Sequence, residues 1–213
     1  LIHMDMSRLQ VSTKYCFDRI CSLIVFPVFL LIFIPIAIAI KLEDGSTVFF
    51  RQKRPGLYGK PFYIWKFRTM IPDADALLTE DQRISAGINR VTRVGKVLRY
   101  FSLDELPQII NIIRGEMSFV GPRPALYESL DKYTERQKTR YRMKPGITGL
   151  AQVNGRNLLK WSKRIEYDLY YIEHYSLWLD LKIIVKTIKV VLLRKGIVLD
   201  RNPGQVDDLG EQK

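Results

Sequence analysis

The feature that most constrains this chain is an uncharged apolar run near the N-terminus, from Ile20 to Ile40. A straight helix of that length would be about 30 Å long, roughly the thickness of a bilayer's hydrocarbon core. The run is too long for a signal peptide and lacks the small-residue cleavage site of one. We therefore expect a helix that stays in the membrane.

Two prolines and the flanking charges complicate a simple span. Pro27 and Pro35 each remove a backbone donor and clash with the preceding turn, which predicts a kink or a break. A single span should have an excess of basic residues on one side only. Here they stand on both sides: Arg8, Lys14 and Arg19 before the run, and Lys41, Arg51, Lys53 and Arg54 after it. A kinked span and a re-entrant helix that returns to the same face both remain open.

Composition excludes several classes of chemistry. Of two histidines, His3 precedes Met4 in what resembles an expression scar, which leaves His174. The two cysteines, Cys16 and Cys21, lack CxxC spacing. A histidine-rich metal site, a Ser-His-Asp triad, structural zinc and a disulfide framework are therefore not expected. The net charge of +12 predicts an anionic partner, which includes nucleic acid, lipid headgroups and phosphorylated small molecules.

After Lys41 the sequence predicts one mixed domain of α+β class, mostly helical, with a polar tail after Gly196. Short aromatic and β-branched runs predict strands at 47–50 and 62–67, separated by turns. A polar helix and loop are expected at 73–87, helices at 91–101 and 125–142, and a buried apolar segment at 106–114.

The segment from Leu177 to Lys195 predicts an amphipathic helix. Lys182, Lys186 and Lys189 fall on one stripe, and apolar residues cover most of the remainder. That composition is typical of a helix lying in a membrane interface. A core helix with a solvated lysine edge is the alternative.

The most informative motif is SLDELP at 102–107, where Asp104 and Glu105 stand between apolar segments. In one interpretation Ser102 and Glu105 form a capping box that merely starts a helix. Pro107 fits that poorly, because it would fall past the first turn. In the other, the chain breaks or a new helix begins at Pro107, and both carboxylates point outward from the junction.

Basic residues in constrained backbone supply the complementary charge. FVGPRP at 119–124 presents Arg123 between prolines as a rigid fork for phosphate, unless it is a plain turn. PGITGLAQVNGR at 145–156 has three glycines that would let a ligand approach the backbone, and it ends in Arg156. It matches neither the P-loop nor the dinucleotide fingerprint. Further candidates are Lys66, Arg68, Arg99 and Asp168. Carboxylates together with cations are what phosphoryl transfer requires.

These motifs, in this order, resemble the monotopic phosphoglycosyl transferases, the initiating sugar transferases of bacterial glycan assembly. RPG at 54–56 and KFRTM at 66–70 also fit the family pattern. The resemblance extends from Lys14 to about Gly196, and several long motifs in the same order make a chance similarity improbable.

The resemblance implies a two-step transfer. Asp104 would attack the β-phosphate of a UDP-sugar, release UMP and hold the phosphosugar covalently, and undecaprenyl phosphate or another polyprenyl phosphate would then accept it. Glu105, with Asp168 as a further candidate, would hold Mg²⁺. The residues expected to bind phosphates or nucleotide are Lys66, Arg68, Arg99, Arg123, Asn154, Arg156 and Asp168.

The resemblance also implies the layout of the chain on the cytoplasmic face of the bacterial inner membrane. Residues 1–3 would be the scar, 4–41 a re-entrant hairpin broken at Pro35, 42–196 the small globular cytosolic catalytic domain with interfacial amphipathic helices, and 197–213 the tail. The family breaks this helix at a Ser-Pro pair, whereas Ile34 stands here in place of the serine. The alternative is a membrane-anchored protein that binds nucleic acid or anionic lipid without catalysis. It leaves the joint occurrence of the motifs unexplained, and no nucleic-acid partner is expected.

Overall fold

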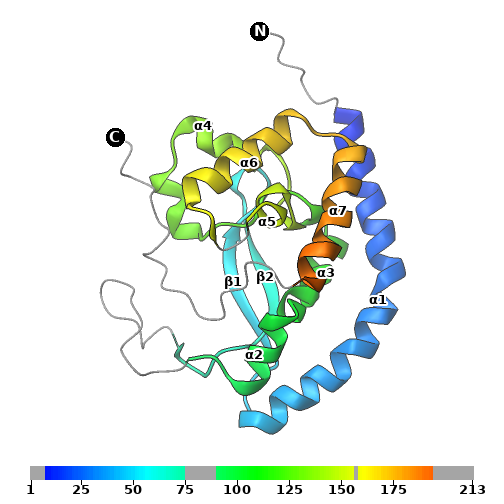
Figure 1. The fold of residues 1–213 in the computed structure, drawn as a ribbon, viewed down its shortest axis with the longest axis vertical. Helices are drawn as coiled ribbons and strands as arrows, with labels where there is room; N and C mark the ends of the chain where they lie inside the picture. The colour runs from blue at the N-terminus through cyan, green and yellow to red at the C-terminus, as the bar shows by residue number, and fades with distance from the viewer. Residues whose placement is uncertain (1–7, 75–89, 156–157, 194–213) are drawn as a thin grey trace.

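The computed structural model describes residues 8–74, 90–155 and 158–193, and this part of the chain is mostly helical with two two-stranded sheets (Figure 1). It begins with α1 (Arg8–Asp44), β1 (Phe49–Pro55), η1 (Leu57–Gly59), β2 (Pro61–Phe67) and α2 (Arg93–Tyr100). The middle contains η3 (Leu103–Gln108), α3 (Ile109–Ile113), β3 (Ser118–Val120), η4 (Tyr127–Lys132), α4 (Glu135–Lys138) and η5 (Thr139–Arg142). The last elements are β4 (Gly146–Thr148), α5 (Leu150–Val153), α6 (Trp161–Glu173) and α7 (Leu177–Leu192).

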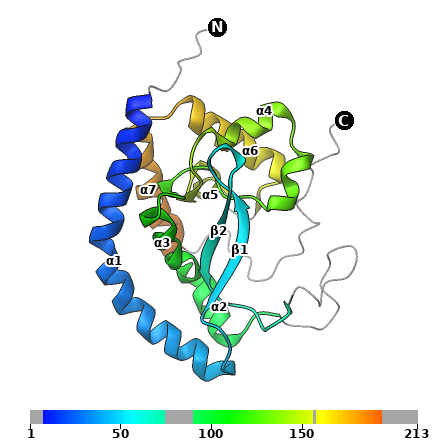
Figure 2. The ribbon, with the colours of Figure 1, turned by 180° about the vertical axis from the view of Figure 1, so that it is seen from behind.

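Helix α1 is continuous through Pro27 and Pro35, so the predicted break at Pro35 is not confirmed. Instead the helix is curved and wraps around one side of the domain (Figures 1 and 2). A proline removes one backbone hydrogen bond, and a long helix tolerates that loss by bending. Its segment Leu9–Asp44 is long and apolar enough to cross a membrane.

One face of α1 lies against the domain along nearly its whole length. The residues on this face recur every three or four positions: Lys14, Asp18, Ser22, Phe26, Phe29, Phe33, Ile36 and Ile40. The opposite face is apolar and exposed: Ile20, Leu23, Ile24, Leu31, Ile34 and Ile38. The two arms of the curved helix therefore hold the same domain, and a continuous apolar surface remains uncovered.

The N-terminal arm of α1 is attached by buried polar groups. Lys14 Nζ lies 2.6 Å from Asp180 Oδ2 and 3.5 Å from Asp18 Oδ2, and the lysine is 2% exposed. Asp18 also accepts a 2.5 Å hydrogen bond from Ser118, and Tyr171 donates one of 2.6 Å to Asp180. This cluster joins α1 to α7, α6 and β3.

The C-terminal arm of α1 is attached by aromatic packing. The ring of Phe33 lies 5.4 Å from that of Phe49 on β1 and 5.9 Å from that of Phe67 on β2. Phe29 stacks on Phe67 as well, at 6.4 Å. Such rings bury large apolar areas, so this contact holds the hairpin against α1.

Strands β1 and β2 form an antiparallel hairpin in which Phe49 is opposite Phe67. The predicted strand at 62–67 is confirmed. The predicted strand at 47–50 is misplaced, because β1 runs from Phe49 to Pro55 through charged residues that face solvent. The helix expected at 91–101 is confirmed as α2.

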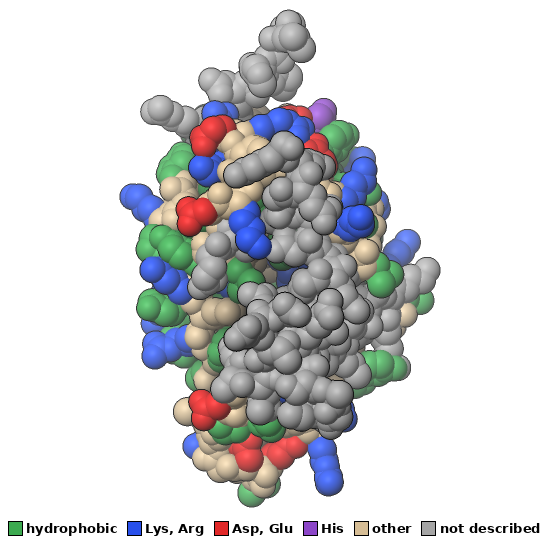
Figure 3. All heavy atoms as spheres, turned by 90° about the vertical axis from the view of Figure 1, so that its left-hand side faces the viewer, with side chains coloured by type: hydrophobic (Ala, Val, Ile, Leu, Met, Phe, Trp, Pro, Cys, Tyr) green, Lys and Arg blue, Asp and Glu red, His purple; other side chains and the backbone are tan. Residues whose placement is uncertain are grey.

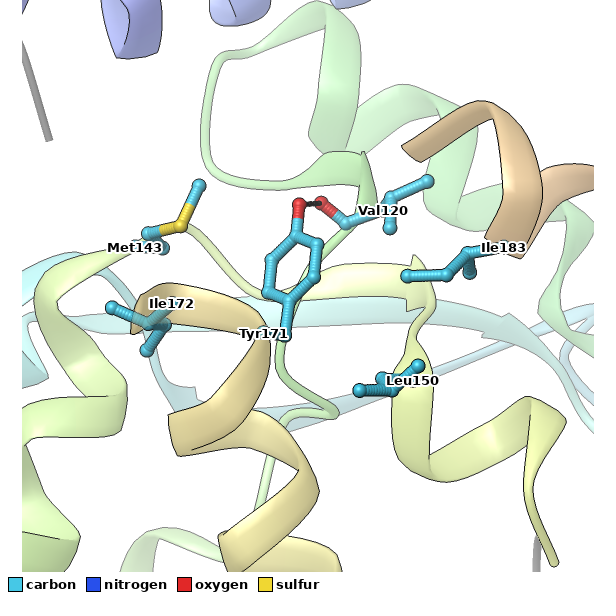
Figure 4. Packing of buried hydrophobic residues seen from close by; sticks show 6 residues of the cluster. All are labelled: Val120, Met143, Leu150, Tyr171, Ile172 and Ile183. Atoms are coloured by element: carbon cyan, nitrogen blue, oxygen red, sulfur yellow. Dashed lines mark hydrogen bonds between the residues drawn. The ribbon is translucent and has the colours of Figure 1, made fainter. Parts of the chain in front are cut away.

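The second sheet is a parallel pair, with Ser118 opposite Gly146 and Val120 opposite Thr148. It brings the FVGPRP and PGITG segments side by side. Behind it lies a core cluster made of Val120, Met143, Leu150, Tyr171, Ile172 and Ile183 (Figure 4). The hydroxyl of Tyr171 donates to the carbonyl of Val120 at 3.3 Å, so α6 is bonded directly to β3.

Helix α7 buries only a narrow stripe, where Asp180 and Ile183 lie. Most of its other apolar side chains are exposed: Leu177, Trp178, Leu181, Ile184, Val185, Ile188 and Leu192, whereas Leu179, Val190 and Val191 are half-buried. A core helix would bury these residues, so the arrangement favours the interfacial interpretation.

Two sequence predictions differ from the structure. The single helix expected at 125–142 is wrong: this stretch forms η4, α4 and η5, because Thr134 starts a new turn in a capping box with Gln137. The sequence also does not predict α6, since two of its buried positions, Arg164 and Asp168, are charged. Most of the helix and loop expected at 73–87 lies outside the described residues.

We predict that Lys14→Met destabilises the protein by about 3 kcal/mol, because it leaves the buried Asp180 carboxylate without its cation. Thermal unfolding in detergent measures the loss. Lys186→Met, the same change at an exposed position of α7, should leave the unfolding temperature unchanged. Equal unfolding temperatures for the two variants would contradict the assigned role of the buried pair.

Candidate active site

A sharp turn between α2 and η3 presents the two adjacent carboxylates. Ser102 adopts a left-handed conformation (φ 57°) and its side chain makes no capping hydrogen bond, so the capping-box interpretation is wrong. Asp104 and Glu105 occupy the first turn of η3, and the chain passes through Pro107 before α3 begins at Ile109. The carboxylates therefore sit at a junction between helices.

Glu105 is held by two cations from distant parts of the chain. Its Oε1 accepts from Lys66 Nζ at 2.7 Å and from Arg123 at 2.8 Å, and its Oε2 lies 3.4 Å from the second guanidinium nitrogen of Arg123. Burial opposes ionisation, but the charges and hydrogen bonds of Arg123 and Lys66 outweigh it and hold the pKa of Glu105 well below its usual range. Glu105 is a fixed anion.

Asp104 lies in the same field but is not held in this way. Burial raises the pKa of Asp104 above its usual value, the Glu105 charge adds to this, and Lys66, Arg99 and Arg123 oppose it. Within the described residues, no hydrogen bond to its carboxylate is found, and the side chain is half-buried. A carboxylate among three cations, without a hydrogen-bond partner in that part of the chain, is available to react.

Arg99 is placed by the packing of α2 on the end of β2. A Cβ at Gly95 would lie 2.1 Å from the carbonyl oxygen of Thr69, so only glycine allows this approach. One turn later, Arg99 Nε donates to the Thr69 hydroxyl at 2.8 Å. The cation thereby faces the turn that carries Asp104.

Arg68 has a different environment from the other predicted phosphate ligands. Its guanidinium forms a fork with Asp44, at 2.5 and 2.7 Å, and also donates to the carbonyls of Thr47 and Met70. These contacts tie β2 to the end of α1. In this structure Arg68 therefore holds the scaffold together.

The glycines of the two loop motifs allow two backbone segments to pack closely against each other. A Cβ at Gly146 would lie 2.1 Å from the nitrogen of Gly121, and one at Gly149 would lie 2.2 Å from the carbonyl oxygen of Gly121. The space that these glycines leave is filled by protein, and not by a ligand as the sequence suggested. Their close approach aligns β3 with β4 and so places Arg123.

The remaining candidates lie apart from the carboxylates or outside the described structure. Asp168 is 1% exposed and paired with Arg140, and burial raises its pKa to about 6 against that pairing. Asn154 bonds the carbonyl of Leu150 at 2.9 Å, and Arg156 is outside the described residues. The sequence does not single out Arg140, since it is one of many basic residues in a charged stretch.

The two carboxylates suit a magnesium ion in donor type. Mg²⁺ favours one or two protein carboxylates completed by substrate phosphates. Among the residues that the structure describes, Arg123 makes the one contact to Glu105 Oε2, a long one, so this oxygen retains capacity to bind an ion. In the described ranges no group of three or more His, Cys, Asp or Glu side chains forms a ready-made metal site. An ion held by these carboxylates would need further ligands, such as substrate phosphates.

Several named proteins are similar in sequence to much of this chain. It is 47% identical over 161 residues to the uncharacterized sugar transferase EpsL of Bacillus subtilis, covering 74% of this chain and 76% of that protein. It is 40% identical to the exopolysaccharide production protein ExoY of Rhizobium meliloti, covering 86% of this chain and 87% of that protein.

A third relative is the UDP-glucose:undecaprenyl-phosphate glucose-1-phosphate transferase of Klebsiella pneumoniae, 46% identical over 186 residues. The match covers 81% of this chain but only 39% of that longer protein. The family model for bacterial sugar transferases matches residues 9–194, which include both carboxylates and the cations around them. This chain belongs to the bacterial sugar transferase family.

Proposed function

We propose that the protein transfers a sugar 1-phosphate from a UDP-sugar to a polyprenyl phosphate, with undecaprenyl phosphate as the acceptor. One observation carries this proposal: Asp104 is unbonded within the described residues, while the neighbouring Glu105 is fixed by Lys66 and Arg123. Adjacent carboxylates in such different environments suit different tasks, one reactive and one structural or metal-binding. The names of several relatives give the same donor and acceptor.

In the first step, an Asp104 oxygen attacks the β-phosphorus of the UDP-sugar. The bond from that phosphorus to the oxygen bridging the two phosphates breaks, and UMP leaves with the bonding electrons. In the second step, a phosphate oxygen of the polyprenyl phosphate attacks the same phosphorus and frees Asp104. Two displacements with a carboxylate nucleophile need no histidine, in agreement with the composition.

The cations around the carboxylates stabilise the transferring phosphoryl group. Lys66, Arg99 and Arg123 approach from β2, α2 and the loop after β3, so positive charge surrounds Asp104. Fixed charges of this kind lower the barrier most when they need not reorganise during the reaction. Glu105, as the carboxylate that stays ionised, would hold Mg²⁺, which supplies further charge neutralisation at the diphosphate.

We infer that the protein is monotopic and lies on the cytoplasmic face of the bacterial inner membrane. Both arms of α1 are bound to one domain, by the Lys14 cluster and by the aromatic cluster. A helix held at both ends by a cytosolic domain must return to its starting face. The exposed apolar faces of α1 and α7 would lie in the lipid.

The surface charge suits a membrane rich in anionic lipids. Figure 3 shows the side of the molecule that is turned away from α1, where Lys and Arg side chains lie along the margins among hydrophobic ones, so basic residues are not confined to the side that would meet the lipid. The whole chain has a net charge of +12. Basic residues near an anionic leaflet each add to membrane attraction.

Replacing the nucleophile tests the proposed reaction. We expect wild-type protein given a panel of UDP-sugars, including UDP-glucose and UDP-galactose, with Mg²⁺ to gain the mass of one phosphosugar and to release UMP. Asp104→Asn should do neither, with UMP release reduced at least about a thousandfold. The exposed Asp131→Asn is the matched control and should behave as wild type. Full activity of Asp104→Asn would refute the assignment.

The pH dependence of UMP release tests the environment of Asp104. The nucleophile must be ionised, and burial raises its pKa above the ordinary value of about 3.9. Release should therefore fall as the pH drops through this raised pKa, while Glu105 stays ionised because its own pKa is lowered. Circular dichroism at each pH separates this loss from unfolding. An acid limb below the ordinary aspartate pKa would count against the assigned environment.

Cysteine labelling tests the topology. In a variant without Cys16 and Cys21, single cysteines would be placed at the exposed positions Leu9 and Leu42, near the two ends of α1. We expect both to react with a membrane-impermeant maleimide in inside-out vesicles and neither in intact spheroplasts. A cysteine in place of the exposed Lys138 marks the cytosolic side. Reaction of just one α1 position in spheroplasts would indicate a spanning helix.

A further inference from the structure

Arg140 is a charged side chain enclosed inside the domain behind the proposed active site. It is 1% exposed, and its guanidinium carbon lies 5.7 and 5.6 Å from the rings of Tyr133 and Tyr141. It donates to the Tyr133 hydroxyl at 3.2 Å, to the carboxylate of Asp168, and to the carbonyl oxygen of Arg123 at 2.8 Å. A buried ion pair contributes little net stability over a well-packed apolar core, so stability alone does not explain it.

We propose that Arg140 is a positioning residue for the transfer reaction, because it fixes the backbone of Arg123 and thereby places the Arg123 guanidinium that binds Glu105. This proposal rests on the function proposed above. The contacts form a continuous path: Asp168 orients Arg140, Arg140 binds the Arg123 carbonyl, and the Arg123 side chain reaches Glu105 at 2.8 Å.

The backbone of this loop explains why a side chain is needed there. Beyond β3, Gly121 N bonds to Thr148 O and Gly146 N bonds to Pro122 O, so backbone hydrogen bonds between the two segments reach as far as Pro122. Arg123 follows directly and is flanked by Pro122 and Pro124, neither of which has an N–H to donate. Arg140 therefore extends the support by one residue, from the end of the sheet to the residue that contacts Glu105.

The size of the expected effect follows from the geometry of catalysis. A displacement of about 1 Å in a group that contacts the reacting atoms costs on the order of 100-fold in rate. Arg140→Lys keeps the positive charge beside Asp168 but replaces the guanidinium, whose Nη2 donates to both Asp168 and the Arg123 carbonyl while Nη1 donates to Tyr133. The shorter ammonium group of lysine cannot keep all three contacts in the same geometry. We expect it to lower kcat/KM for UMP release about tenfold, chiefly through kcat.

A double-mutant cycle separates positioning from a merely structural role. The four proteins are wild type, Arg140→Lys, Arg123→Lys and the double variant, assayed with whichever UDP-sugar the wild type uses. If Arg140 acts through Arg123, Arg140→Lys should cost about tenfold in the wild-type background and less than about twofold once Arg123 is replaced. Equal losses in both backgrounds would overturn the proposal.

Arg136→Lys is the matched control. Arg136 stands four residues before Arg140 and also pairs with a carboxylate on α6, that of Glu166, which it binds through both guanidinium nitrogens, but this pair is exposed. The same substitution there should leave UMP release and its dependence on Arg123 unchanged. A loss of activity equal to that of Arg140→Lys would show that any disturbance of the contacts between this segment and α6 slows UMP release. That result would contradict the proposal.

Tyr133→Phe decides the question if Arg140→Lys does not fold. It removes the hydroxyl that accepts the 3.2 Å bond from Arg140 and keeps the ring. We expect a two- to threefold loss of kcat that disappears in the Arg123→Lys background, and a persistent loss would overturn the proposal. Absence of UMP release from the wild-type protein with every UDP-sugar would instead refute the proposed function itself.

Discussion

The meeting of Lys66 and Arg123 on the carboxylate of Glu105 is the interaction on which the rest of the site depends. It joins β2, η3 and the loop after β3, three segments that are distant in sequence. Two cations on one anion leave an excess of positive charge beside Asp104, and Arg99 adds to it. Glu105 is already neutralised by its cations. The remaining positive charge can therefore balance the charge that Asp104 carries and the charge that a diphosphate would bring.

Much of the site was predictable because its residues stand in motifs of rigid backbone. Asp104, Glu105, Lys66 and Arg123 were all named from the sequence, and the structure brings them together. The motifs did not reveal which of these residues contact the carboxylates and which of them hold the scaffold together. Arg68 and Asp168 resemble phosphate or metal ligands in sequence, yet their partners, Asp44 and Arg140, become visible only in the folded chain. Gly146 and Gly149 were interpreted as a ligand cradle and instead face the backbone of Gly121.

The fold was predictable where the local pattern is strong and was missed where distant contacts decide. Strand β2 and helix α2 follow from aromatic and helical spacing, whereas the parallel pairing of β3 with β4 joins segments that are 28 residues apart in register, Ser118 with Gly146. Helix α6 was not predicted because Arg164 and Asp168, two charged residues, occupy positions that face inward. In α1 the prolines were expected to kink or break the helix, but the helix is continuous through both of them and is curved, with both arms supported by the domain.

The adjacency of Lys66 and Phe67 on β2 has a mechanical consequence. Phe67 stacks on Phe29 and Phe33 of α1, while Lys66, on the opposite face of the strand, binds Glu105. Two consecutive residues thus link α1 to Glu105, the neighbour of Asp104. A tilt or vertical displacement of α1, such as one imposed by a thicker or thinner bilayer, would reach the carboxylates through this strand and also through the direct contacts of α1 with α2 and α3. Membrane thickness would therefore set the height at which the carboxylate meets the phosphate of its lipid acceptor.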